Sequence, residues 1–131
     1  MNEELSGTIP VLYHGTCESA AETLLEQGFA PEKSPSQGAN MGRRGFLYVT
    51  NVWENAQWFA NEKGCNTILE IKDVPISSLV VDPEDGMGSS VQDELKQAEA
   101  MGFPAYLAIS RKLSAEHFSM HRNIASKEGT K

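Results

Sequence analysis

The sequence predicts a single α+β domain in which short strand-like runs are separated by about three amphipathic helices. The chain has 131 residues, enough to bury about two thirds of its unfolded surface around one core. Hydrophobic residues make up 40% of it and charged residues 22%, which is ordinary for a globular protein. No internal repeat or second domain is apparent, so residues 1–131 are predicted to form one domain, with a polar tail at residues 122–131.

The first strand is predicted at residues 11–13, an apolar run that ends at His14-Gly15. Glycine at that point lets the backbone approach a ligand closely or take a positive φ. A helix should follow and leave His14 at the mouth of a strand–loop–helix unit. The signals for this helix are Thr16 or Ser19 as N-cap, Ser19 with Glu22 as a capping box, the apolar stripe Ala21, Leu24 and Leu25, and Gly28 as its end.

A second strand and helix repeat this plan. Residues 46–49 have the apolar, β-branched and aromatic character of a strand. The helix after it should end at Gly64. Its signals are the capping pair Asn51 and Glu54 and the apolar positions Trp53, Ala56, Phe59 and Ala60.

The rest of the chain is predicted to complete the sheet and add a third helix. Strand-like runs occur at residues 67–71, 79–81, 105–109 and 117–120. The third helix lies between the second and third of these runs. Its signals are Ser90 with Asp93 as cap, the stripe Val91, Leu95, Ala98 and Met101, and Gly102 as its end.

The charge balance limits the partners of the protein. The net charge is −7 and the isoelectric point is near 4.9, so the surface as a whole repels phosphate backbones and nonspecific nucleic-acid binding is disfavoured. No run approaches the length of a membrane span and no secretory signal is visible, so we expect no membrane association and a cytoplasmic location, in the producing cell or in a target cell.

The cysteines and histidines do not predict a metal site. Cys17 and Cys65 lie far apart and form no CxxC pair, so we expect reduced thiols and no zinc. Cys17 is also a candidate nucleophile because it would lie near a helix N-terminus, which lowers the pKa of a thiol. His117 and His121 have a spacing that suits a metal on a helix, but no third ligand accompanies them.

Two motifs carry a resemblance to a known family. "LYHGT" at residues 12–16 is followed by a short helix, then by "GFLYVT" at residues 45–50 and a helix with the pattern A..FA. This order resembles the ADP-ribosyltransferase fold, and most closely its His-Tyr branch, that of the diphtheria-toxin-like transferases and poly(ADP-ribose) polymerases. The resemblance covers residues 11–63, roughly half of the chain. It implies a compact fold with a split, mostly antiparallel sheet, and NAD as co-substrate.

The resemblance implies roles for individual residues. His14 would hold the adenosine ribose, the backbone of Gly15 would pair with the nicotinamide carboxamide, and Thr16 would support the loop. Tyr48 would offer its ring to the nicotinamide, and Phe59 or Trp58 would cover the same pocket. A planar cation binds well between aromatic faces. The alternative for each residue is structural: a histidine at a strand end and a tyrosine in an apolar strand are often packing residues.

The third catalytic position is not marked by a motif. Many members of the branch place a Glu near the start of a late strand, where a carboxylate stabilises the positive charge that develops as nicotinamide departs. The predicted late strand 106–109 offers no carboxylate, and the closing segment is also similar to the tRNA 2′-phosphotransferase branch, where an apolar residue takes that position. We expect Glu116 or Gln92 to supply the role, each being otherwise a solvated side chain.

Arg43 and Arg44 stand out in this acidic chain. Guanidinium groups bind pyrophosphate in a bidentate manner, so the pair is predicted to contact the pyrophosphate of NAD or to be solvated on the surface. The function predicted first is an NAD-dependent mono-ADP-ribosyltransferase of a toxin- or effector-like kind with a protein acceptor. The alternatives are an RNA 2′-phosphotransferase, which the acidic surface disfavours, and a catalytically weak module that binds NAD or ADP-ribose.

Overall fold

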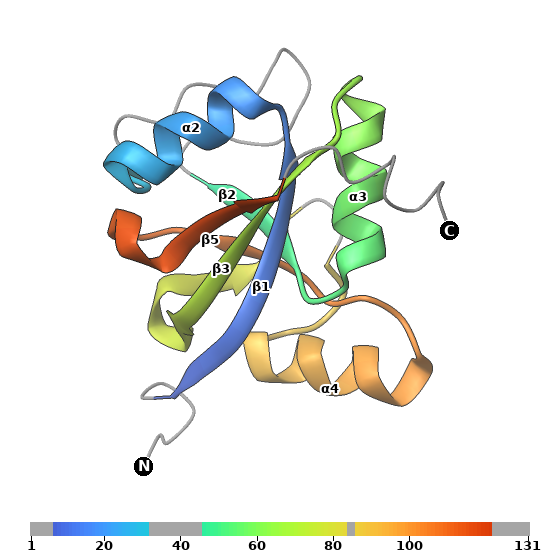
Figure 1. Ribbon diagram of the computed structural model, residues 1–131. Helices are drawn as coiled ribbons and strands as arrows, with labels where there is room; N and C mark the ends of the chain where they lie inside the picture. The colour runs from blue at the N-terminus through green and yellow to red at the C-terminus, as the bar shows by residue number, and fades with distance from the viewer. Residues whose placement is uncertain (1–6, 32–45, 84–85, 122–131) are drawn as a thin grey trace.

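The computed structural model describes residues 7–31, 46–83 and 86–121, and within them it shows an α+β fold with one six-stranded sheet and three α-helices (Figure 1). The fold class predicted from the sequence is confirmed. In chain order the elements are β1 (Thr8–Thr16), α2 (Glu18–Gln27), β2 (Leu47–Thr50), α3 (Trp53–Glu62), β3 (Thr67–Pro75), β4 (Leu79–Val81), α4 (Val91–Met101), β5 (Tyr106–Ile109) and β6 (Phe118–His121).

The sheet is antiparallel and divides into two halves. Its strand order is β4-β5-β2-β1-β3-β6, and β1 pairs with β3 along its whole length, from Thr8 opposite Pro75 to Thr16 opposite Thr67. By contrast, Tyr13 opposite Thr50 is the single residue pair that joins β1 to β2 in the described chain. The sheet is therefore split between β1 and β2, with three strands on either side.

Side-chain alternation along β1 directs its two faces to different helices. Leu12 and its partner Ile71 are fully buried in the main core, to which α2 contributes Ala21. Tyr13 belongs instead to a smaller cluster with Ala56 of α3. Because successive side chains of a strand point to opposite faces, α2 and α3 lie on opposite sides of β1, as Figure 1 shows.

Helix α2 begins between the two predicted N-cap positions, Thr16 and Ser19. Thr16 is the last residue of β1 and Ser19 lies inside the helix, whose N-cap is Cys17 with no side-chain hydrogen bond. The predicted capping box is therefore wrong. The register of β1 against β3 decides this, because pairing up to Thr67 keeps Thr16 extended. Gly28 ends the helix as predicted, with a φ of 75°.

Helix α3 also lacks its predicted cap. Its N-cap is Val52, and the side-chain oxygen of Asn51 instead accepts a hydrogen bond of 2.8 Å from the backbone N–H of Ala105. A tertiary contact thus takes the oxygen that would have capped the helix. Two alanines of the predicted apolar stripe, Ala56 and Ala60, are fully buried.

Helix α4 has the predicted cap and end. The Ser90 hydroxyl accepts a hydrogen bond of 3.1 Å from the Asp93 N–H, and Gly102 ends the helix in the left-handed region at a φ of 74°. Val91 and Ala98 of the predicted stripe are buried, whereas Met101 is 54% exposed. Inclusion of Met101 in the stripe was therefore wrong.

Candidate functional site

The candidate site lies where β1 and β2 separate. His14 follows Tyr13, the residue of β1 that pairs with β2, and its imidazole spans the gap beyond that pair: Nδ1 lies 2.6 Å from the backbone oxygen of Tyr48. His14 is inside β1 and only 6% exposed, not at a loop mouth as predicted, because β1 continues to Thr16. The structure therefore joins His14 and Tyr48, the two residues around which the predicted site was built.

The hydrogen bond fixes the tautomer of His14. The carbonyl oxygen of Tyr48 can only accept, so Nδ1 carries the proton and donates it. Burial, assisted by the nearby charge of Lys63, lowers the pKa of His14 from 6.5 to about 3, although the bond to Tyr48 acts in the opposite direction. The ring is therefore neutral at neutral pH. Nε2 keeps its lone pair, and it has no hydrogen-bond partner among the residues described.

An aromatic surface lies beside this imidazole. Leu47 and Val49 point into the main core, so Tyr48 faces the other side of β2, where it is half-buried and its ring packs edge-on against Phe46. On the same side, Tyr106 of β5 lies opposite Thr50, two residues from Tyr48 along β2. A row of aromatic rings therefore extends across the half of the sheet that contains β2.

Helix α3 contributes to the same surface. The ring of Phe59 lies 6.3 Å from that of Tyr106, and the ring of Trp58, which is 56% exposed, lies edge-on at 5.2 Å from that of Phe59. The hydroxyl oxygen of Tyr106 is 3.3 Å from the Asn55 amide nitrogen and 3.3 Å from the Asn55 amide oxygen. Tyr106 and Asn55 were missed by the sequence reasoning. The alternation of β5 places Tyr106 on the face of Tyr48, but only the strand order reveals that β5 is next to β2.

The backbone of Gly15 is engaged by α3 and by a lysine. A Cβ on Gly15 would overlap the backbone oxygen of Ala56 and lie 2.8 Å from the nitrogen of Ala60, so glycine is needed for the close approach of the helix. Its carbonyl accepts a hydrogen bond of 2.8 Å from Lys63 Nζ. A carboxamide that paired with Gly15 would have to share this oxygen with Lys63 or displace it. Lys63 was not predicted as a site residue.

The two cysteines form a disulfide, which corrects the expectation of reduced thiols. Cys17 follows β1 and Cys65 follows the turn after α3, and their Cα atoms are 5.1 Å apart although 48 positions separate them. The packing of α3 against β1 brings them together, which no spacing rule reveals. In this bonded form Cys17 is not a nucleophile. Lys63 lies two residues before one half-cystine and Gly15 two residues before the other.

The two predicted candidates for the third position lie elsewhere. Glu116 is exposed in the short 3-10 turn before β6, and β3 separates β6 from β1 on the side away from β2. Gln92 is in the first turn of α4, a helix that packs on β4 and β5. Neither position is at the gap between β1 and β2.

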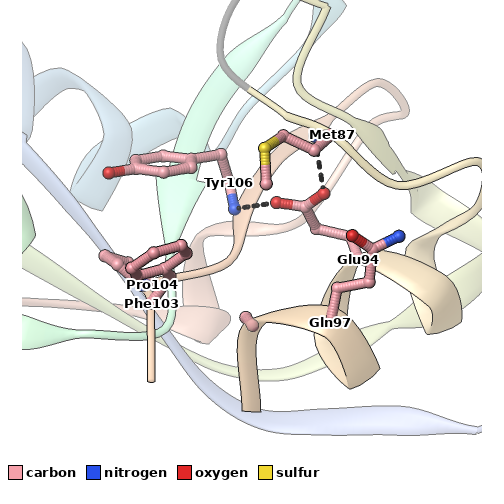
Figure 2. Close-up of a pocket in the computed structure, with 7 residues that line it drawn as sticks. Met87, Glu94, Gln97, Phe103, Pro104 and Tyr106 are labelled. Carbon is pink, nitrogen blue, oxygen red and sulfur yellow. Dashed lines mark hydrogen bonds between the residues drawn. The ribbon is translucent and has the colours of Figure 1, made fainter. Parts of the chain in front are cut away.

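A carboxylate does lie at the start of the late strand, and it belongs to Glu94 of α4. Its Oε1 accepts hydrogen bonds from the N–H groups of Met87 (2.8 Å) and Gly88 (2.6 Å), and its Oε2 accepts one from Tyr106 (3.0 Å). The side chain is 4% exposed, and Figure 2 shows it directed from the helix toward Met87 and Tyr106. With both oxygens engaged by backbone donors, Glu94 is a structural clamp.

Three other residues were predicted to contact NAD or to support its site: Thr16, Arg43 and Arg44. Thr16 ends β1 opposite Thr67 and is 3% exposed. Arg43 and Arg44 lie outside the described residues. In the part of the chain that is described, no three histidine, cysteine, aspartate or glutamate side chains gather as metal ligands, and no helix is long and apolar enough to cross a membrane.

No protein-family model matches the sequence, and no curated protein matches it.

Proposed function

We propose that the protein is an NAD-dependent mono-ADP-ribosyltransferase that modifies a protein acceptor and releases nicotinamide. The observation that carries the proposal is the neutral His14, bonded to the backbone of Tyr48 across the split in the sheet. It adds to the resemblance of the segments 12–16 and 45–50 to the His-Tyr branch of the ADP-ribosyltransferases.

The chemistry of the site residues suits this co-substrate. Nε2 of a neutral His14 is an acceptor, and a ribose hydroxyl is a donor that would satisfy it. The rings of Tyr48, Phe59 and Tyr106 offer aromatic faces and edges for the positively charged nicotinamide, worth about 0.5–2 kcal/mol for a single cation–π contact. Arg43 and Arg44 remain the proposed partners of the pyrophosphate.

Transfer requires the bond between nicotinamide and the ribose carbon to break while the acceptor attacks that carbon. A carboxylate facing the ribose would stabilise the developing positive charge. Glu94 has both oxygens occupied, and Glu116 lies beyond β3. This favours a second candidate function, a module that binds NAD or ADP-ribose with weak or no transfer. The RNA 2′-phosphotransferase alternative is disfavoured by the net charge of −7.

The proposal places the reaction in a cytoplasm, because the co-substrate is held inside cells. Disulfides form mainly in oxidising compartments, so the Cys17–Cys65 bond favours a protein that passes through such a compartment before it acts. An effector delivered to a target cell fits both conditions.

Calorimetric titration with NAD tests the proposal, with His14→Ala and Tyr48→Ala as the site variants. His117→Ala is the matched control. The Nδ1 of His117 also lies 2.8 Å from a backbone carbonyl oxygen, that of Lys72, but this histidine is not at the gap between β1 and β2. We expect each site variant to lose at least about fivefold in NAD affinity, the value of one hydrogen bond or ring contact, and the control to be unchanged. Indifference of the wild-type protein to NAD would refute the proposal.

Nicotinamide release separates the two candidate functions. Labelled NAD and a protein mixture should give a labelled acceptor and free nicotinamide if the protein is a transferase. Binding without release of nicotinamide would identify the binding module instead.

A further inference from the structure

A small cavity lies beside α4, outside the His14–Tyr48 gap. Its volume is about 210 Å³, below the range of about 300 Å³ or more that is typical of small-molecule sites. Figure 2 shows side chains of Tyr106, Phe103 and Met87 around the space in front of Glu94, with Gln97 of α4 beside it. The apolar part of the lining consists of Met87, Ala98, Phe103, Pro104 and Tyr106.

The walls of the cavity are fixed by hydrogen bonds. Glu94 ties the segment at Met87 and the start of β5 to α4 through three backbone N–H groups. Asp93 adds a bond of 2.9 Å from the Ser89 N–H, and the Gln97 amide donates to the same carboxylate oxygen at 2.9 Å. The cavity is therefore preformed, which lowers the entropic cost of binding.

The polar atoms of the lining do not specify a polar ligand. Both oxygens of Glu94 and the amide nitrogen of Gln97 are engaged within the protein, so the cavity presents mainly apolar surface. Met87 is 62% exposed and Phe103 54% exposed. Large apolar side chains exposed together beside a pocket are typical of an interaction site.

The charge of the surroundings favours a basic partner. Helix α4 carries the carboxylates of Asp93, Glu94 and Glu99 against the single cation Lys96, and the whole chain has a net charge of −7. Complementary charge attracts a segment rich in lysine or arginine and suppresses acidic partners. The size of the cavity fits one apolar side chain of a partner, and the acidic charge of its surroundings favours basic residues next to that side chain.

The cavity and the candidate NAD site share one residue, Tyr106. This residue lines the cavity, and its ring packs edge-on against Phe59 on the aromatic surface that includes Tyr48. A peptide anchored in the cavity would therefore lie next to the aromatic surface of the candidate site.

We propose that this cavity anchors the protein acceptor by receiving one leucine-sized or aromatic side chain from a lysine- and arginine-rich segment. The proposal rests on the proposed transferase function for the identity of the partner. Binding of the segment itself requires no NAD and is measured separately.

The test is fluorescence anisotropy with a short labelled peptide of lysine and arginine residues around one central leucine, in the absence of NAD. We expect binding to weaken at least about fivefold when the leucine is replaced by alanine or when the flanking residues are replaced by glutamate. Phe103→Ala should weaken binding to a similar extent. Met101→Ala is the matched control, because Met101 is also 54% exposed but does not line the cavity, and it should bind like the wild type.

Three outcomes would overturn the inference. These are equal binding of the leucine and alanine peptides, equal binding of the basic and glutamate peptides, and equal loss in the Phe103 and Met101 variants. A second copy of the chain is the competing occupant, so sedimentation that reveals a dimer abolished by Phe103→Ala would also overturn it. NAD titration of the wild-type protein separates the two proposals. A protein that binds NAD but not the peptide would contradict the anchor alone, and one that binds the peptide but not NAD would contradict the NAD site alone.

Discussion

His14 joins β1 to β2 with a side chain at a point where the backbone ladder has ended. Its Nδ1 donates to Tyr48 O across the split, so the imidazole contributes to holding the two halves of the sheet together. The same bond leaves Nε2 as an acceptor. One residue thereby serves stability and the proposed recognition of a ribose, and the structural and functional interpretations of this histidine are compatible.

The pH dependence of stability should reveal this histidine. In the folded protein the pKa of His14 is lowered to about 3, below its ordinary value of 6.5, so the unfolded chain binds the proton more readily. The neutral ring therefore makes its full contribution to folding stability above about pH 6.5, and this contribution is lost as the pH falls from there toward 3. At pH 5 the loss is about 2 kcal/mol.

Urea unfolding at about pH 7.5 and pH 5 measures the effect. Between these two pH values the free energy of unfolding of the wild type should fall by about 2 kcal/mol more than that of His14→Gln. The free energy of unfolding of His117→Gln should fall by the same amount as that of the wild type. Parallel losses in the wild type and His14→Gln would show that the buried ring is not held neutral.

At the scale of elements, the clearest case is the attachment of α4 to the sheet. Glu94 of α4 accepts hydrogen bonds from both the preceding segment and β5. The close approach of the preceding segment to α4 requires glycine at position 88, because a Cβ there would lie 2.7 Å from the Cα of Glu94. The helix is positioned by this carboxylate as well as by burial of Val91 and Ala98.

Glu94→Gln should destabilise the protein by about 2–3 kcal/mol. The amide keeps one acceptor oxygen and turns a donor toward backbone N–H groups, leaving buried donors unsatisfied. Denaturant unfolding gives the magnitude, and amide exchange of Met87, Gly88 and Tyr106 should accelerate. Asp93→Asn, a change on the exposed side of the same turn, is the control and should leave these three amides protected. Unchanged exchange in Glu94→Gln would contradict the clamp.

At the scale of the whole molecule, the Cys17–Cys65 disulfide joins the end of β1 to the loop that leads into β3. The covalent loop spans α2, β2 and α3, so it contains one strand of the proposed site, β2, and begins directly after the other, β1. The disulfide also lies close in sequence to the hydrogen bond between Lys63 and Gly15: Gly15 is two residues before Cys17, and Lys63 is two residues before Cys65. Reduction is expected to loosen this end of the sheet.

Breaking the disulfide should lower the free energy of unfolding by about 2–4 kcal/mol, because the cross-link restricts the unfolded chain. Thermal or urea unfolding with and without a reductant measures this. A variant with Ser at both positions 17 and 65 should have the stability of the reduced protein and should not respond to reductant. A wild-type protein whose stability is the same in both conditions would show that the bond does not form in solution.

Part of the fold and of the site could be predicted from local pattern. The strand at residues 79–81 and the helix from Ser90 to Gly102 were located correctly, because alternation, capping and glycine ends act over a few neighbouring residues. The caps of α2 and α3 could not be predicted. Tertiary contacts decide them: Thr16 stays in β1, and Asn51 bonds Ala105.

The sequence by itself determined the α+β class, the apolar strands, the glycine-terminated helices and the pairing of His14 with the Tyr48 segment as the place to look for a site. Only the tertiary structure decided the split between β1 and β2, the neutral tautomer of His14, the bond from Lys63 to Gly15, the disulfide, and the role of Glu94 as a clamp. The physical reason is distance along the chain. Local periodicity reports which side of an element is buried, whereas each of these features joins residues that folding brings together from separate elements.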